Sequence, residues 1–230
     1  MLGVTFSAAL TVNPVEHHGS NELVKRAQLS DGTHSLEAGN INKGLSWMSS
    51  GILLSSLETP AKTYRIAMWT PRQRIEFWTP GVADGTTQKF KWRFYLSSQT
   101  KTTKNFFHLM QVLSRGDGGP IVTLDAVNDR IMIKDYKRDC DVTGCPSIPL
   151  DRFTDRTTVH FVTVTFGPKG SLEYVIKDAA DESVALLSYS VKGAMGSDSS
   201  SIKFGTYHLA VDGMTKSLAY AGDFVDESDS

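Results

Sequence analysis

Residues 203–208 (KFGTYH), near the C-terminus, combine side-chain types that can bind an anion and move a proton. If this segment is a strand, alternation puts Lys203, Gly205 and Tyr207 on one face. A glycine within a strand costs stability and often marks a place where a ligand or another backbone comes close. A lysine and a phenol on either side of that gap could hold an anionic sugar and transfer its proton. An ordinary amphipathic strand would show the same pattern.

Three other strand-like segments also carry polar or aromatic side chains on single faces. They are Arg74, Glu76 and Trp78 in residues 72–78, Lys91, Arg93 and Tyr95 in residues 89–97, and Gln111 in residues 106–113. A sheet face rich in arginine, lysine, glutamine, tyrosine and tryptophan suits a groove for a polar, anionic polymer. The alternative is a solvated face with cross-strand ion pairs.

The elements that must position these residues are strands. Helical periodicity is almost absent, and short alternating or apolar runs are separated by Gly, Pro, Ser, Asp and Asn, which favours an all-β sandwich or barrel. Strands are expected near residues 63–69, 73–78, 88–97, 105–113, 121–126, 130–136, 158–166, 171–177, 183–191, 202–211 and 217–224. The 230 residues suit one all-β domain. The net charge of -1 indicates no bulk attraction to nucleic acid or membrane.

The N-terminal part of the sequence is typical of a processed segment. Residues 1–12 are mildly apolar, and Lys25-Arg26 resembles the pro-peptide cleavage site of fungal secreted proteins, although a chance dibasic pair would look the same. We therefore predict a signal or pro-segment over residues 1–26, a single domain over residues 27–230, and secretion from the cell.

The two cysteines fit an extracellular protein. Cys140 and Cys145 lie in a turn-rich loop with four residues between them, and no second ligand pair at metal-binding spacing accompanies them. A local disulfide in an oxidising compartment is the expected state. No catalytic zinc spacing and no calcium-type loop is present, so no metal site is predicted.

Three candidate reactions can be compared with the residues that the sequence offers. Glycoside hydrolysis normally needs two carboxyl groups, and Glu76 is the only strand carboxylate on the candidate faces. A serine hydrolase would need a Gly-x-Ser-x-Gly elbow, which is absent. β-Elimination on a uronic-acid polymer fits better, because it needs donors for the sugar carboxylate, a base for the C5 proton and an acid for the bridging oxygen. A tyrosine near a cation can serve as base, acid or both.

Five short motifs carry a family resemblance. Residues 74–78 (RIEFW) look like an Arg-x-Glu-Leu-Arg strand with the last arginine replaced by tryptophan, and residues 203–207 (KFGTY) look like Lys-Ala-Gly-x-Tyr. Residues 111–113 (QVL) match Gln-Ile/Val-His without the histidine, and residues 106–111 (FFHLMQ) show a His-x-x-Gln pattern instead. Residues 219–224 (AYAGDF) match a closing strand. In this order and spacing, the motifs resemble those of jelly-roll polysaccharide lyases of the alginate-lyase type, most closely fungal glucuronan lyases.

The resemblance, which covers residues 63–224, implies a β-jelly-roll sandwich of two antiparallel sheets with a concave substrate groove. It implies that Tyr207 transfers the proton and that Gln111 and Arg74 neutralise the uronate carboxylate. His108 also becomes a candidate catalytic residue. Because His108 lies three residues before Gln111, a regular strand would turn the two to opposite faces, and only a bulge would bring them together.

The remaining implied roles concern substrate binding. Lys203 would lower the pKa of the phenol or bind a neighbouring sugar. Arg93 and Glu76 would line the groove, Trp78 would stack on a sugar ring, and Gly205 would leave room for the sugar. We thus expect a secreted, monomeric lyase acting on an anionic polysaccharide, glucuronan before alginate, without a required cofactor. Structural calcium occurs in such folds but has no motif here. The alternatives are a carbohydrate-binding sandwich without turnover and, with less support, a sandwich glycoside hydrolase.

Overall fold

The computed structural model describes residues 40–41, 45–50, 72–116, 118–209, 211 and 217–228, with the backbone alone for residues 40–41, 45–50 and 72–75. The predicted leader, residues 1–26, and the strand expected at residues 63–69 lie outside the described residues. No helix of the described part is long and apolar enough to cross a membrane.

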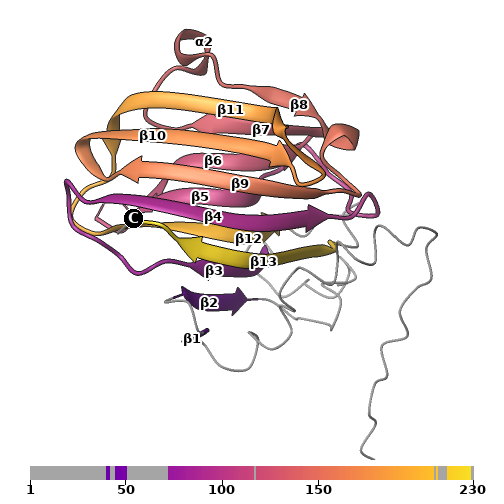
Figure 1. The fold of residues 1–230 in the computed structure, drawn as a ribbon, viewed down its shortest axis with the longest axis horizontal. Helices are drawn as coiled ribbons and strands as arrows, with labels where there is room; N and C mark the ends of the chain where they lie inside the picture. The colour runs from indigo at the N-terminus through magenta and orange to yellow at the C-terminus, as the bar shows by residue number, and fades with distance from the viewer. Residues whose placement is uncertain are drawn as a thin grey trace, which may run out of the picture.

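Two antiparallel sheets stack face to face, as Figure 1 shows. The eight-stranded sheet runs, in spatial order, β1 (Asn40–Ile41), β2 (Leu45–Ser50), β3 (Arg72–Trp78), β12 (Ser200–Leu209), β5 (Phe107–Ser114), β6 (Gly119–Val127), β7 (Arg130–Asp135) and β8 (Ser147–Pro149). The five-stranded sheet runs β11 (Asp181–Met195), β10 (Gly167–Asp178), β9 (Thr157–Thr165), β4 (Thr87–Leu96) and β13 (Ala219–Asp226). The described helical turns are α2 (Cys140–Thr143) and a 3-10 turn, Leu150–Arg152. The predicted all-β sandwich of two antiparallel sheets is confirmed.

An aromatic core between the sheets decides which side of each strand turns outward. Trp92 on β4 stacks on Phe204 on β12, with ring centroids 4.8 Å apart, and both side chains are almost fully buried. Because side chains alternate along a strand, burial of Phe204 turns Lys203 and Tyr207 to the outer face of the eight-stranded sheet. The packing of the core therefore places Lys203 and Tyr207 together on the outer face of this sheet.

A histidine is buried within this core in its neutral form. His160 on β9 is 1% exposed and stacks on Trp92 at 4.9 Å. Its Nε2 lies 2.9 Å from the Thr158 hydroxyl and its Nδ1 2.6 Å from the Tyr174 hydroxyl. Burial lowers the pKa of His160 to about 3. Both ring nitrogens are thus satisfied by hydroxyl groups, and the residue has a structural role.

His160 predicts a loss of stability in mild acid. In the unfolded chain this histidine takes up a proton near its ordinary pKa of 6.5, whereas in the folded protein it does so only near pH 3, so stability present above pH 6.5 is lost as the pH falls. The free energy of unfolding should drop by about 2 kcal/mol between pH 7.5 and pH 5 from this group. Urea denaturation across that range measures it. His160→Gln, which keeps hydrogen-bonding groups but does not titrate, should lack this component, and an unchanged pH slope in that variant would contradict the assignment.

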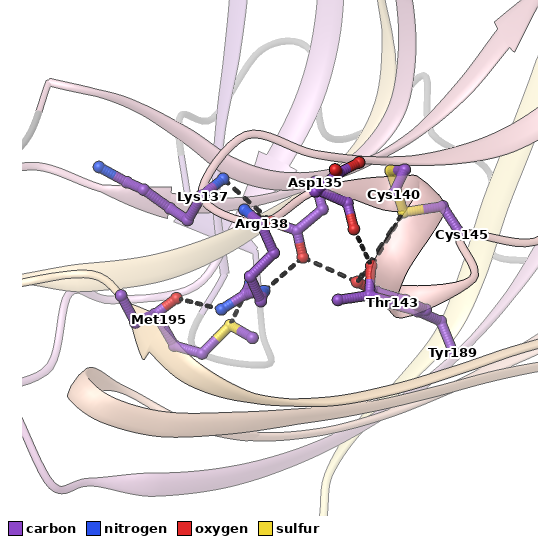
Figure 2. Close-up of polar contacts among 10 residues, drawn as sticks. Asp135, Lys137, Arg138, Cys140, Thr143, Cys145, Tyr189 and Met195 are labelled. Atoms are coloured by element: carbon purple, nitrogen blue, oxygen red, sulfur yellow. Dashed lines mark hydrogen bonds and ion pairs between the residues drawn. A yellow bond between two sulfur atoms is a disulfide. The ribbon is translucent and has the colours of Figure 1, made fainter.

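A polar cluster joins the two sheets at the end of β7 (Figure 2). The Arg138 guanidinium donates from Nε to Asp135 at 2.6 Å and from Nη1 to the Ala194 carbonyl on β11 at 2.9 Å. The Tyr189 hydroxyl, also on β11, donates to the same Asp135 carboxylate at 2.8 Å. Since β7 and β11 belong to different sheets, these bonds tie the layers together.

The loop beside this cluster carries the disulfide. Cys140 and Cys145 are bonded, as predicted, and they bracket the single turn of α2. Asp139 caps the turn by accepting from the backbone N–H of Asp141, and Gly144 ends it at φ 68°, a conformation that favours glycine. The disulfide therefore pins a short capped turn over the edge of the sandwich, next to Tyr189 (Figure 2).

Candidate functional site

A bulge in β5 brings His108 and Gln111 to the same face of the sheet. The pairing of β5 with β6 shifts between His108 and Met110, and the adjacent side chains of Leu109 and Met110 both enter the core, at 2% and 1% exposure. Such a bulge reverses the alternation once along the strand. His108 and Gln111, three positions apart, consequently both lie on the outer face.

The neighbouring strand, β12, also pairs irregularly at this position. The pairing of β12 with β5 shifts between Phe204 and Tyr207, after which Tyr207 is aligned with His108. Gly205 lies within this shift at φ 138°, where a residue with a Cβ is strained. The structure thus gives Gly205 a backbone role in the irregular pairing, and clearance for a sugar at this position stays a prediction.

Tyr207 and His108 lie side by side, with ring centroids 5.7 Å apart. Phe106, just before β5, stacks on the His108 ring at 4.9 Å and meets the Tyr207 ring edge-on at 5.0 Å. Phe106 is a residue that sequence reasoning missed, although its position two residues before His108 suggested the same face. The phenol and the imidazole are thereby held together as a pair by one aromatic ring.

Gln111 and Glu76 form a second, buried pair beside the first. The Gln111 side-chain amide donates to the Glu76 carboxylate across β5, β12 and β3, and the two residues are 4% and 1% exposed. Lys203 on the intervening β12 pairs in register with Gln111 and is 7% exposed. Glu76 is the register partner of Gly205 and so lies on the same face as Gln111, where the contact orients the Gln111 amide.

Trp78 lies at one end of this cluster with two cations over its ring. The Arg115 guanidinium carbon is 4.6 Å and the Lys203 ammonium 5.4 Å from the ring centroid. Such cation–π contacts each contribute about 0.5–1 kcal/mol at exposed sites. Arg115, which the sequence did not single out, is exposed, so a sugar that stacks on that face of Trp78 must displace it.

A buried carboxylate on β6, that of Asp125, lies next to His108. Asp125 is 0% exposed, its Oδ1 lies 2.6 Å from His108 Nδ1, and its Oδ2 lies 3.0 Å from Lys134 Nζ on β7. Burial opposes ionisation of Asp125, but the hydrogen bond and charge of His108 and the charge of Lys134 outweigh it, so the pKa of the carboxyl is lowered. The sequence analysis missed Asp125, although a single acid within an apolar strand was a usable signal.

The structure does not bring all the predicted residues together. Arg74 pairs with Tyr207 in the β3–β12 ladder, but its side chain lies outside the described residues. Arg93 is on β4 in the opposite sheet, with Nε 3.6 Å from the Asp223 carboxylate. The prediction that Arg93 lines the groove is therefore corrected, because alternation assigns a residue to a face of its strand without saying which sheet the strand joins.

The described residues contain no group of three or more His, Cys, Asp or Glu side chains arranged to hold a metal ion. The carboxylates of the cluster instead hold amide, imidazole and ammonium groups: Glu76 holds Gln111, and Asp125 holds His108 and Lys134. What the arrangement offers chemically is a phenol, an imidazole with a carboxylate partner, an oriented amide and two lysines on one sheet face.

No protein-family model matches this sequence, and no curated protein sequence matches it. Solved structures do match. A GH131 β-glucanase catalytic domain from Podospora anserina aligns at TM-score 0.53 and 10% identity, covering 81% of this chain and 72% of that one. A protein of unknown function from Shewanella oneidensis MR-1 aligns at 0.52 and 12% identity, covering 93% and 95%.

Polysaccharide lyases are also among the structural matches. The endo-β-1,4-glucuronan lyase of Trichoderma reesei aligns at TM-score 0.49 and 12% identity, covering 83% of this chain and 91% of that one, and several alginate lyases match as well. At these identities a likeness shows the fold alone, and the two matches above TM-score 0.5 carry it. The chain has the jelly-roll β-sandwich fold that its motif resemblance to polysaccharide lyases predicted.

Proposed function

We propose that the protein is a polysaccharide lyase that cleaves a uronic-acid polymer by β-elimination, with glucuronan as the first substrate to test and alginate as the second. The single observation that carries the proposal is the alignment of Tyr207 with His108 on the outer face, next to Gln111 and Lys203. Two proton-transferring groups and two hydrogen-bond donors then lie on adjacent strands. The disulfide fits the secreted, extracellular location that we propose. A monomer is part of the same proposal.

The proposed reaction breaks two bonds and forms one double bond. The base removes the C5 proton, the C5–H electron pair forms the C4–C5 double bond, and the C4–O bond to the leaving sugar breaks. His108 takes the C5 proton, and the Tyr207 hydroxyl gives its proton to the leaving oxygen. A proton transfer from the imidazolium to the phenolate then restores both groups.

Negative charge develops on the sugar carboxylate during proton removal, and donors aimed at it lower the barrier. The second N–H of the Gln111 amide and the Lys203 ammonium serve this role in the proposal, and Arg74, aligned with Tyr207 by its backbone, is the third candidate. No metal or redox cofactor has a step in this scheme.

Binding without turnover is a second candidate, and one observation favours it. Gln111 and Lys203 are only 4% and 7% exposed in the free protein, whereas Tyr207 and Trp78 are partly exposed. A sugar can therefore reach the aromatic side chains more readily than the donors. A hydrolase has less support, because the two carboxylates of the cluster, Glu76 and Asp125, are buried and already hold other side chains.

One assay separates these possibilities. The purified protein is incubated with glucuronan, alginate and pectate, and both the ultraviolet absorbance of unsaturated uronate ends and the number of reducing ends are followed. A lyase raises both together. Reducing ends without absorbance would replace the lyase by a hydrolase, and polymer binding without either signal would leave a carbohydrate-binding module.

A further inference from the structure

A carboxylate as deeply buried as that of Asp125 lowers the stability of the fold unless its charge is compensated. The Asp125 side chain is 0% exposed, and it shares one face of β6 with Thr123, opposite the apolar Val122, Leu124 and Ala126 that enter the core. An ionised carboxylate without water must be compensated by partners. Asp125 has one on each oxygen: His108 Nδ1 at 2.6 Å and Lys134 Nζ at 3.0 Å. The row Lys134–Asp125–His108 thus runs across β7, β6 and β5.

The two partners have different consequences. Lys134 can only donate, and its charge helps keep Asp125 ionised. An ionised carboxylate can only accept, so His108 must carry its proton on Nδ1. The remaining nitrogen, Nε2, is then left without a proton and is the one able to take one up. Phe106 against the ring at 4.9 Å limits its rotation.

The same bulge that turns His108 outward also sets it opposite Asp125. His108 and Asp125 are register partners in the β5–β6 ladder, directly beside the shift between His108 and Met110. On its other side His108 is the register partner of Tyr207. The acid, the imidazole and the phenol therefore lie at one level of the sheet on β6, β5 and β12.

We propose that Asp125 is a positioning residue, which holds His108 in the tautomer protonated on Nδ1 and so keeps Nε2 free to accept the C5 proton. The role in catalysis rests on the proposed function, whereas the tautomer does not. Lys134 stabilises the charged form of Asp125, and the set works as a unit on the same sheet face as Tyr207.

Asp125→Asn tests the proposal with little change in shape. Lys134 takes the amide oxygen of the new side chain, because an ammonium cannot accept, and this turns the NH2 group toward His108 Nδ1. Nδ1 must then accept, and the proton moves to Nε2, as in other Asp–His pairs in which Asn replaces Asp. We expect kcat to fall at least about ten-fold while KM changes little.

The readout is the 15N spectrum of histidine-labelled full-length protein at about pH 8, with the His108 signals assigned by their loss in His108→Gln. Support requires the Nδ1–H tautomer in the wild type and Nε2–H in Asp125→Asn. An Nε2–H tautomer in the wild type, or an unchanged tautomer in the variant, overturns the proposal. If Asp125→Asn does not fold, the wild-type spectrum still tests the proposal, because it shows directly whether Nδ1 carries the proton.

Asp135→Asn is the matched control. Asp135 is a similarly buried carboxylate in the cluster between the sheets, held by Arg138 and Tyr189 (Figure 2). Its loss should lower thermal stability but leave the His108 tautomer and kcat unchanged. A tautomer change in both variants would show a general structural effect and overturn the assignment to Asp125. If the wild type releases no unsaturated product, the lyase proposal fails while the spectrum still decides the tautomer.

Discussion

Tyr207→Phe is expected to lower kcat by about 10²–10⁴-fold, the usual contribution of a general acid or base. The variant removes only the hydroxyl group, so no proton can be passed to the leaving oxygen. The ring remains, and with it the edge contact to Phe106 at 5.0 Å and the neighbouring His108 at 5.7 Å. Thermal stability should therefore stay close to that of the wild type.

The measurement is the initial rate of unsaturated product on the best polymer of the substrate screen, with thermal unfolding of the same preparation. Tyr220→Phe supplies the matched control, since Tyr220 lies on β13 in the other sheet, against Tyr95. It should keep the wild-type rate. A Tyr207→Phe enzyme that turns over at nearly the wild-type rate would remove Tyr207 from the mechanism and leave His108 without its proposed acid partner.

Gly205→Ala should damage both stability and turnover. A Cβ at φ 138° is strained, which costs roughly 1–3 kcal/mol, and relief of that strain displaces the β12 backbone beside Tyr207. Because a shift of about 1 Å in a reacting group can cost about 10²-fold in rate, we expect kcat to fall by that order. Urea denaturation and the lyase assay together measure the two effects.

The Gly205→Ala variant distinguishes the backbone role of Gly205 from a role in leaving room for the sugar. If glycine served only to leave room for the sugar, Gly205→Ala would lose activity at unchanged stability, and the backbone role would be wrong. Gly119→Ala is the control, because Gly119 lies on β6 at an ordinary φ with open space where a Cβ would be. It should be close to neutral in both measurements.

Much of the fold could be predicted because its signals are local. Alternation identified most strands, and in the structure the aromatic run of β4 and Phe204 of β12 enter the core. The short loop between Cys140 and Cys145 likewise allowed the disulfide to be inferred before the structure confirmed it. Such features depend on neighbours within a few residues, which a sequence displays directly.

The site could be predicted only in part, because two of its properties are not local. Alternation gave Arg93 the right strand face but not its sheet, and β4 turned out to pair with β9 and β13. His108 joined Gln111 only through a bulge, which the sequence allowed but could not require. The role of Asp125 depends on its contacts with Lys134 and His108, which lie on neighbouring strands.

By itself, the sequence determined the all-β class, the strand carrying Lys203 and Tyr207, and the pairing of the two cysteines, since side-chain alternation and short loops act over a few residues. The tertiary structure decided which strands share a sheet, where the alternation breaks, and which groups meet the buried carboxylates. These depend on hydrogen-bonded register between strands far apart in the chain. A shift of one residue in that register moves a side chain from one face to the other.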